Sequence, residues 1–504
     1  MSGVLKISVD IFIIMPYSYN MMRTQENKMT EFYFTGNDLI EMGIKPGPEF
    51  GVILKELNSA LQNTKDADEG TADQILADIL DNYKAKAAAS EARRTARMML
   101  MLTRDEAVSV IYNIIPQSED EVANVDSVRD TMEQLVLTPT VVGAAVMPDA
   151  CPAGSIPVGG VAGAKNAIHP GWHSADICCS MFATNFGSAD PKAILDAMQA
   201  ATHFGPGGRD RANEATMPVE LRDALNSGNP FFADKRLQDR ARSHLMTQGD
   251  GNHFAFVGRS EATGDTWLIT HHGSRGFGAL LYKAGMEVAE RFRKELCPAL
   301  DKGHAFIPYD TDEGRDYWAA LQVAREWTKT NHSMLHDAVA SATGATAGYQ
   351  RWNEHNFVFK DGDVFWHAKG ATPIHNGFLP DTDGVQIVPL NMSQPILFVK
   401  GTRHAGNLGF APHGAGRNYS RTQHKRRMSG ETDADIFARE TQGIDARFWC
   451  GTIDISELPS AYKDADQVQA QMAQFDLAAV VDRIQPYGAI MAGDWEKDAP
   501  WRRR

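Results

Sequence analysis

Residues of metal-ligand type recur through the middle of the chain. Asp176 lies three positions before Cys179, and His253 follows a Gly-Asn pair. His271 opens a His-His-Gly-Ser-Arg-Gly run, and His355 follows an Asn-Glu pair. A set that mixes carboxylate, thiolate and imidazole suits Mn, Fe or Zn better than Mg or Ca, which prefer oxygen ligands. A single histidine is more often a hydrogen-bonded structural residue than a ligand, so spacing alone leaves both interpretations open.

A second group of residues that could carry chemistry lies in the glycine-rich loop at 411–421. Glycines let backbone N–H groups approach an anion, and the two arginines four positions apart, Arg417 and Arg421, can grip phosphate. His413 in such a loop could act as an acid, a base or a nucleophile. Lys369 adds a cation on another glycine-containing turn. The alternative interpretation is a pair of solvated basic turns.

The overall composition limits the classes to which the protein can belong. The chain has 504 residues, of which 43% are hydrophobic and 23% charged, and its net charge is −14 at pH 7. These values exclude a disordered chain and argue against a protein that coats nucleic acid through bulk charge. Residues 401–430 nevertheless contain six Arg and Lys and no Asp or Glu. That segment predicts one focused basic cleft beside His413, and any polyanion bound there should bind in a salt-sensitive way.

The five cysteines, two of them adjacent, form an odd and sparse set that does not suit a disulfide framework. We therefore expect a reducing compartment, the cytoplasm. The apolar stretch 4–15 is too short for a membrane span and lacks a signal-peptide cleavage site, so we expect no membrane association. Met29 precedes a more regular sequence, and residues 1–33 are interpreted as a leader that lies before the native start.

The elements that must position these residues alternate between helical and strand-like zones. Helices are predicted where apolar residues recur at helical spacing, at 50–61, 71–97, 279–345 and 464–482. Residues 136–147 are rich in Val, Thr and Ala and indicate a buried strand, and 350–460 indicates short strands and glycine-rich loops. The stretch from 147 to about 278 is dense in Gly, His and Asp, which is typical of loops that carry chemistry.

In their order along the chain, these motifs resemble the RtcB family of RNA ligases over roughly residues 130–493. The blocks that carry the resemblance are Met147-Pro148-Asp149, Ile156-Pro157-Val158-Gly159-Gly160-Val161, Asp176-Ile177-Cys178-Cys179, Gly251-Asn252-His253-Phe254, His271-His272-Gly273-Ser274-Arg275-Gly276, His355-Asn356, Lys369-Gly370-Ala371-Thr372 and His413-Gly414-Ala415-Gly416-Arg417. The resemblance implies an α+β fold with a central β-sandwich-like core flanked by helices. A small helical extension at 34–125 would precede a ligase domain at 126–504, which has a helical insertion around 279–345.

The resemblance also implies an activity. RtcB-type ligases join an RNA 3′-phosphate or 2′,3′-cyclic phosphate end to a 5′-hydroxyl end, in RNA repair or tRNA splicing, and they use GTP and Mn²⁺. By this resemblance His413 attacks the α-phosphorus of GTP and carries the nucleotide as a phosphoramidate. One Mn²⁺ would be bound by Asp176, Cys179 and His253, and the other by Cys179, His271 and His355.

The remaining roles implied by the resemblance concern the nucleotide and the RNA. The residues expected at the nucleotide, besides His413, are Asn252, Lys369, Asn391, Gly414, Ala415 and Gly416. Arg417, Arg421 and Asp149 are expected at RNA or phosphate. The implied partners are RNA, tRNA among them, and a nucleoside triphosphate, and the need for an activating protein is left open.

Several positions depart from the family pattern. Where the family reads guanine with an acidic residue, this chain has Phe256, and Ile396 stands at a second base-contacting place. The family's terminal Lys is missing from residues 490–493. A carboxylate is the natural partner of guanine N1–H and N2–H₂, so these changes predict relaxed or altered nucleotide choice. Cys151 replaces a family histidine, as a substitute ligand or a buried thiol, and His173 stands at a usually apolar position.

Other interpretations stay open at this point. Residues 38–51 look like a helical segment of the tRNA nucleotidyltransferase family, which suggests an RNA-docking module; a structural helical cap is the alternative. For the whole protein, the competing activities are a metal-dependent RNA-end phosphate hydrolase or nucleotidyl-transfer enzyme that no longer seals. A non-catalytic RNA-end-binding protein is the alternative from outside the enzymes.

Overall fold

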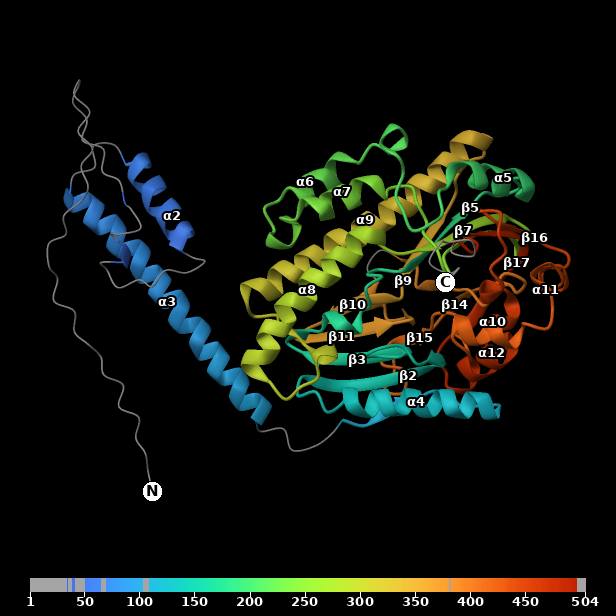
Figure 1. The fold of residues 1–504 in the computed structure, drawn as a ribbon, viewed down its shortest axis with the longest axis horizontal. Helices are drawn as coiled ribbons and strands as arrows, with labels where there is room; N and C mark the ends of the chain where they lie inside the picture. Colours follow the sequence, from blue (N-terminus) through green and yellow to red (C-terminus); the bar gives the residue numbers. More distant parts are fainter. Residues whose placement is uncertain are drawn as a thin grey trace. The chain divides into compact units, whose positions relative to one another are not determined.

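The computed structural model describes residues 34, 39–40, 50–64, 69–102, 108–379 and 382–495, and the chain divides into compact units at residues 1–99 and 100–504 (Figure 1). The described part of the first unit includes α2 (Phe50–Asn63) and most of α3 (Glu69–Leu102). Their buried residues recur every four positions and form a separate small core, Ile53, Leu57, Leu61, Ala72, Leu76 and Leu80. The helices predicted at 50–61 and 71–97 are therefore present. Residues 38–51 lie mostly outside the described residues, and an RNA-docking role for them stays a prediction.

Two main sheets form the centre of the second unit. The five-stranded sheet has the order β1 (Val110–Tyr112), β2 (Val141–Cys151), β3 (Val158–Lys165), β11 (Val364–Lys369) and β10 (Asn356–Asp361). The eight-stranded sheet runs β13 (Val385–Val388), β14 (Ile396–Lys400), β17 (Ala479–Met491), β6 (Phe254–Ser260), β7 (Thr266–His272), β5 (Ser180–Asn185) and β9 (Gln350–Glu354), and β16 (Asp445–Phe448) pairs with β17. Smaller pairs are β12 (Ala371–Pro373) with β15 (Phe410–Pro412) and β4 (Ala167–Ile168) with β8 (Ile307–Pro308). Side chains from both main sheets share one core, which fits the expected sandwich-like centre.

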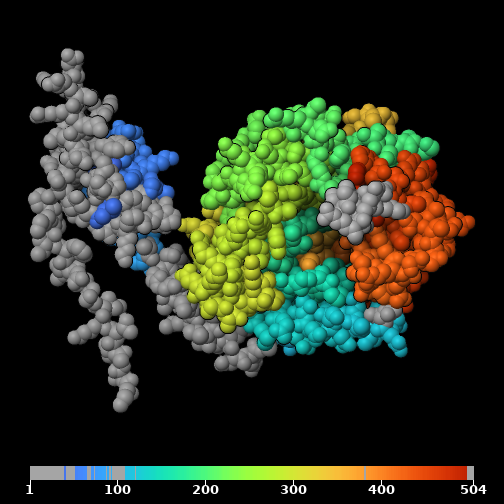
Figure 2. Space-filling view, viewed as in Figure 1, coloured from blue at the N-terminus to red at the C-terminus, as the bar shows by residue number. Residues whose placement is uncertain are grey.

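Helices cover these sheets. They are α4 (Glu119–Leu135), α5 (Pro191–Ala201), α6 (Val219–Leu225), α7 (Lys235–Ser243), α8 (Arg275–Leu296), α9 (Asp312–Thr343), α10 (Arg421–Arg427), α11 (Asp433–Glu440) and α12 (Ala465–Gln474). Figure 2 shows the surface that α6–α9 (green to yellow), α4 (cyan) and the segment from α10 to α12 (orange) present on one face. The mixture of helices and sheets is the expected α+β fold.

The sequence explains how two of these helices form and pack. Helix α4 begins after Ser118, whose hydroxyl accepts from the Glu121 N–H, and its buried residues recur at helical spacing, Val125, Val128, Met132 and Leu135. That face packs against β2 and β3. Helix α9 begins after Thr311, which caps it, and ends at Gly344 in the left-handed conformation that glycine adopts most easily.

The structure differs from the predicted elements at three places. The helix predicted at 464–482 is wrong beyond α12, because residues from Ala479 pair with β14 and β6 as strand β17. The strand predicted from residue 136 begins at Val141, because the intervening residues end α4. The loop-rich zone from 147 to 278 also contains α5, α6 and α7. Helices α8 and α9 fill the helical zone predicted at 279–345.

The predicted boundary near residue 125 falls inside α4. Strand β1 pairs with β2, and α4 packs on the same sheet, so both belong to the second unit. We therefore place the boundary before Val110. All five cysteines are free. Among the described residues, no helix combines the length and apolar character needed to cross a membrane.

Candidate active site

Four of the five side chains predicted as metal ligands lie at the ends of neighbouring strands of the eight-stranded sheet. Cys179 immediately precedes β5, His253 precedes β6, His271 lies at the end of β7, and His355 follows β9. Strand β5 pairs antiparallel with β7 and β9, and β6 pairs antiparallel with β7. The start of one strand therefore lies beside the end of its neighbour, which brings together segments that are far apart in sequence.

Two groups of ligand atoms result. Asp176, Cys179 and His253 form one, and Cys179, His271 and His355 the other, with the atoms of each group within 4.8 Å of one another. His253 Nε2 lies 3.0 Å from Asp176 Oδ2 and 3.5 Å from Cys179 Sγ. His271 Nε2 lies 3.1 Å from Cys179 Sγ and 3.1 Å from His355 Nε2. The Cys179 sulfur belongs to both groups, so one thiolate could bridge two ions.

Backbone carbonyls set the tautomers of two of these histidines. His253 Nδ1 donates to the Gln248 carbonyl at 2.7 Å, and His271 Nδ1 donates to the Asn252 carbonyl at 3.0 Å. Each ring then carries its lone pair on Nε2, the atom that faces the ligand group. Burial lowers the pKa of His271 to about 3 and lowers that of His355 well below its usual value. Both rings are therefore neutral at pH 7.

The acid and the thiol of the cluster respond to burial in different ways. Burial, the largest effect, raises the pKa of Asp176, but the charge and hydrogen bond that His253 supplies when protonated, with a hydrogen bond from Cys179, outweigh it and leave the pKa at about 2. Burial and the nearby Asp176 raise the pKa of the Cys179 thiol. A bound cation would reverse that effect, because a coordinated thiol loses its proton.

The donor set fits transition-metal ions. Two imidazole nitrogens bound to one tetrahedral ion at about 2.1 Å lie about 3.4 Å apart. The 3.1 Å between the Nε2 atoms of His271 and His355 is close to that separation. Two neutral rings that face each other through nitrogen need a proton or a cation between them. The mixture of sulfur, nitrogen and oxygen donors is the kind that Mn, Fe and Zn accept.

His413 lies beside this cluster and is held by Asp149. The rings of His413 and His355 have centroids 4.9 Å apart. His413 Nδ1 donates to Asp149 Oδ2 at 2.6 Å, and the same oxygen accepts from the backbone N–H groups of His413 at 3.0 Å and Gly414 at 3.2 Å. Asp149 is fully buried in β2. The carboxylate thus fixes the ring so that Nε2 carries the lone pair.

Two glycines make this arrangement sterically feasible. A Cβ atom at Gly416, which has φ of +73°, would lie 2.0 Å from the Asp149 carbonyl oxygen. At Gly370, with φ of +63°, a Cβ atom would lie 2.9 Å from Cε1 of His413. Both backbone conformations and both close approaches require glycine.

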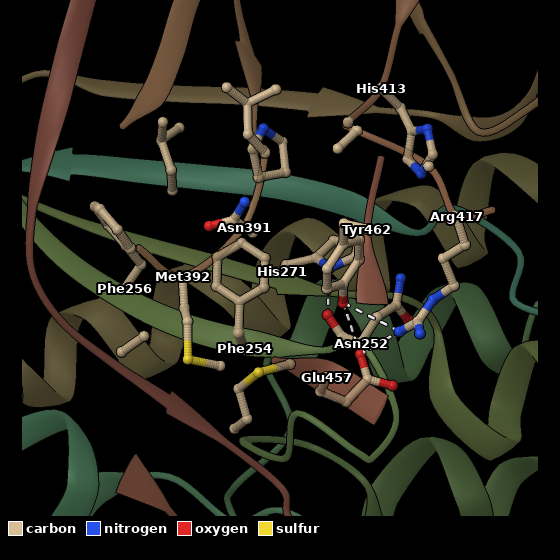
Figure 3. Close-up of a pocket in the computed structure, with 18 of the residues that line it drawn as sticks. Asn252, Phe254, Phe256, His271, Asn391, Met392, His413, Arg417, Glu457 and Tyr462 are labelled. Carbon is tan, nitrogen blue, oxygen red and sulfur yellow. Dashed lines mark hydrogen bonds and ion pairs between the residues drawn. The ribbon is translucent and has the colours of Figure 1, made fainter. Parts of the chain in front are cut away.

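A cavity of about 260 Å³ opens beside His413 (Figure 3). It is lined by most of the residues predicted at nucleotide and phosphate, namely Asn252, Asn391, His413, Gly414, Ala415, Gly416, Arg417 and Arg421, and by the candidate metal ligand His271. In Figure 3, His413 and Arg417 lie at one end, and Phe254, Phe256, Met392 and Asn391 lie at the other. The cavity therefore has a polar end near the candidate nucleophile and an apolar end away from it.

The two arginines of the cavity are held by a carboxylate that sequence reasoning missed. Glu457, in the short 3-10 turn η6 (Ile455–Glu457), is 2% exposed. It accepts from Arg417 Nη2, Arg421 Nε and the Tyr462 hydroxyl at 2.6, 2.6 and 2.7 Å. The Glu457 charge raises the pKa of Arg421, and Arg417 also stacks over the Tyr462 ring at 4.5 Å. No local spacing signals Glu457 or Tyr462, because both reach the arginines only through the tertiary fold.

Two residues predicted at phosphate have other partners in this structure. Lys369 does not line the cavity: its ammonium donates to the carbonyls of Ala153 at 2.6 Å and Ile156 at 3.2 Å, and burial lowers its pKa to about 8. Asp149 is expected at RNA or phosphate, yet its carboxylate faces His413. A buried carboxylate repels phosphate, so a positioning role suits it better.

The two other departures from the family pattern have distinct surroundings. Cys151 lines the cavity, and burial raises the pKa of its thiol, but it belongs to neither group of ligand atoms found among the described residues. His173 is fully buried, with Nε2 2.9 Å from the Tyr317 hydroxyl, and burial lowers its pKa to about 4. The contacts of His173 are those of a structural residue.

Comparisons with known proteins match the part of the chain that contains this site. The family model described as tRNA-splicing ligase RtcB matches residues 131–492. A tRNA-splicing ligase RtcB from Archaeoglobus fulgidus is 26% identical over 438 residues, which cover 71% of this chain and 90% of that protein. The RNA-splicing ligase RtcB of Escherichia coli K12 is 29% identical over 370 residues, or 67% of this chain and 87% of that protein. The matched region contains both sheets, apart from β1, and the whole cavity.

Proposed function

This chain belongs to the RtcB family, and from that membership we propose that it is an RNA ligase of tRNA splicing or RNA repair. It joins a 3′-phosphate or 2′,3′-cyclic phosphate RNA end to a 5′-hydroxyl end through a nucleotidyl-histidine intermediate. The observation that carries the proposal is the position of His413, which Asp149 holds beside the five-ligand cluster and at the polar end of the cavity.

The first chemical step belongs to His413. Its Nε2 lone pair attacks the α-phosphorus of a nucleoside triphosphate, a nitrogen–phosphorus bond forms, and the bond to the pyrophosphate oxygen breaks. The Nδ1 proton stays on the ring, because Asp149 accepts it in a hydrogen bond and stabilises the positive charge that develops on the imidazole. Arg417 and Arg421 lie at the phosphate end and offset charge on the leaving pyrophosphate.

Two transfers complete the reaction. An oxygen of the RNA 3′-phosphate attacks the bound nucleotide, which breaks the bond to His413 and activates the RNA end. A cyclic phosphate end first needs water to open it. The 5′-hydroxyl of the second RNA then attacks the activated phosphorus, a phosphodiester forms, and nucleoside monophosphate leaves. The hydroxyl proton passes to a base at the site or to solvent.

Asp176, Cys179, His253, His271 and His355 would hold the metal ions, two Mn²⁺ by family resemblance, with Cys179 shared. When bound, such ions polarise phosphoryl oxygens and stabilise charge on entering and leaving oxygens. The tautomers set by the Gln248 and Asn252 carbonyls orient His253 and His271 for this binding. We further propose RNA as the partner at the basic α10 surface, and the cytoplasm as the location, in keeping with five free cysteines.

A nucleotide-adduct assay tests the proposal. The full-length protein is incubated with Mn²⁺ and each α-³²P-labelled triphosphate, and the labelled protein is compared with the His413→Ala variant. We expect an adduct with at least one nucleotide, absent in the variant, and sealing of a 3′-phosphate RNA to a 5′-hydroxyl RNA. An adduct without sealing would favour a nucleotidyl-transfer enzyme. Failure of every triphosphate to label a metal-loaded, folded protein would favour a non-catalytic RNA-end-binding protein.

A further inference from the structure

The end of the cavity that lies away from His413 is built from apolar side chains on adjacent strands. Phe254 and Phe256 are two positions apart on β6, so they face the same side of the sheet. They pair with Met491 and Ala489 of β17, which therefore face the same side. With Ile396 at the start of β14, these residues form the wall on which a nucleobase would rest if the reacting phosphate lay at His413.

Few polar groups remain at that end for reading a base. Figure 3 shows Asn391 on the side of the cavity that holds Phe254, Phe256 and Met392, whereas Asn252 lies near Glu457 and Tyr462. The Asn391 side-chain oxygen already accepts from the Ser393 N–H at 3.0 Å, which leaves its amide N–H₂ as the group to meet a base. Among the described residues that line the cavity, Glu457 supplies the one carboxylate, and its oxygens accept from two arginines and Tyr462.

The polar groups at this end of the cavity are unfavourable for binding guanine. The Watson–Crick edge of guanine presents N1–H and N2–H₂, donors that need acceptors once they are removed from water. The apolar wall supplies none from its side chains, and Asn391 offers a donor. A lone donor can pair with the acceptor that every base carries, so it does not favour one base. Adenine brings one exocyclic amine and a ring nitrogen acceptor, and it leaves fewer donors unsatisfied.

We infer that this cavity does not select guanine, and that it binds adenine nucleotides at least as tightly as guanine nucleotides. The inference rests on the proposed function, because it takes the cavity to be the nucleotide site of that reaction. Binding strength then comes from stacking on the apolar wall and from the phosphate groups near Arg417 and Arg421. Asn391 is the residue through which a base preference can be introduced.

Competitive binding tests this directly. The full-length protein with Mn²⁺ is loaded with a fluorescent ATP analogue, which is displaced by ATP, GTP or inosine triphosphate. Inosine triphosphate differs from GTP only by lacking the N2 amine. We expect ATP to compete at least as well as GTP, and inosine triphosphate to bind about 3- to 10-fold tighter than GTP, because no buried N2 amine is left unpaired.

Binding of GTP tenfold or more tightly than both ATP and inosine triphosphate would overturn the inference. The ligase proposal would survive that outcome if His413 still became labelled by GTP. Absence of binding by any triphosphate to the folded protein would refute both statements, since the cavity would not be a nucleotide site.

A substitution at Asn391 provides a second measurement. Asn391→Asp keeps the shape and the acceptor for Ser393, and it replaces the free amide with a carboxylate oxygen that can accept from guanine N1–H or N2–H₂. We expect the GTP-to-ATP affinity ratio to rise at least tenfold. Asn226→Asp, which adds the same charge at the exposed end of α6, is the matched control and should leave the ratio unchanged. An unchanged ratio in Asn391→Asp would contradict the placement of this residue at the base.

Discussion

The hydrogen bond between Asp149 and His413 predicts different rates of adduct formation for two substitutions of Asp149. One oxygen, Asp149 Oδ2, accepts from the ring and from two backbone N–H groups, and the other oxygen is buried without a partner among the described residues. Asp149→Asn can therefore keep its amide oxygen at the Oδ2 position and preserve the His413 tautomer. What it loses is the negative charge opposite a ring that becomes positive during attack. A charge-assisted hydrogen bond exceeds a neutral one by about 1 to 2 kcal/mol, so adduct formation should slow roughly 5- to 30-fold.

Asp149→Ala provides the contrast, because it removes all three hydrogen bonds and frees the ring. Misplacement of a reacting group by about 1 Å costs roughly 10²-fold, so this variant should be at least that much slower. The assay is rapid-quench labelling at saturating nucleotide, with thermal unfolding to verify the fold and Asp363→Asn as an exposed control. The reasoning would be refuted if Asp149→Asn were as slow as Asp149→Ala, since the amide would then have turned. A rate within twofold of the wild type would show that the charge does not act on the ring.

Three further predictions follow from the surrounding residues. Cys179 belongs to both ligand groups, so Cys179→Ala should abolish binding of both ions, whereas His355→Ala should abolish binding of one. Mass spectrometry of the protein-bound metal measures this. An unchanged metal content in either variant would contradict the proposed ligand groups. Burial lowers the pKa of Lys369 from 10.5 to about 8, so the unfolded chain binds more protons between these values and stability should rise with pH from 8 to 10.5. Lys369→Met should abolish that rise in the free energy of unfolding, which is at most about 3 kcal/mol. Urea unfolding of both proteins at pH 8 and pH 10 measures the difference. The same pH dependence in both proteins would contradict the burial of the Lys369 amine. Charge reversal at Arg426 and Arg427, exposed on α10 beside the cavity, should weaken RNA binding more than nucleotide binding, and equal loss of both would argue against a basic RNA cleft there.

Family resemblance, carried by the order of the motifs, predicts which candidate ligands approach one another. Ligands such as Cys179 and His355 are far apart in sequence, and their convergence depends on antiparallel pairing that no local pattern reports, so the prediction rested on family resemblance. Glu457 was not predicted, because the sequence around a carboxylate in a short turn does not show which arginines it contacts in the fold. The direction of the Lys369 side chain was also inaccessible, since it depends on which carbonyls the fold leaves nearby.

Among the secondary-structure elements, amphipathic helices such as α9 were predicted well because their spacing reflects the face they bury. The segment after residue 474 was predicted poorly. Its Ala- and Val-rich sequence continues a helical pattern, but pairing with β6 and β14 makes residues from Ala479 a strand. Tertiary pairing outweighs local propensity there, as is common for strands.

The placement of the ligands at strand ends has a consequence for the assembly of the protein. An ion bound by Cys179, His271 and His355 would cross-link the ends of β5, β7 and β9, and an ion bound by Asp176, Cys179 and His253 would tie β6 to β5. Such an ion stabilises the folded state by binding to it, because the unfolded chain does not hold the ligand atoms together. Because the ligand atoms approach one another only after those strands pair, we expect ion binding to be a late event in folding. The bound ions then stabilise the paired strands.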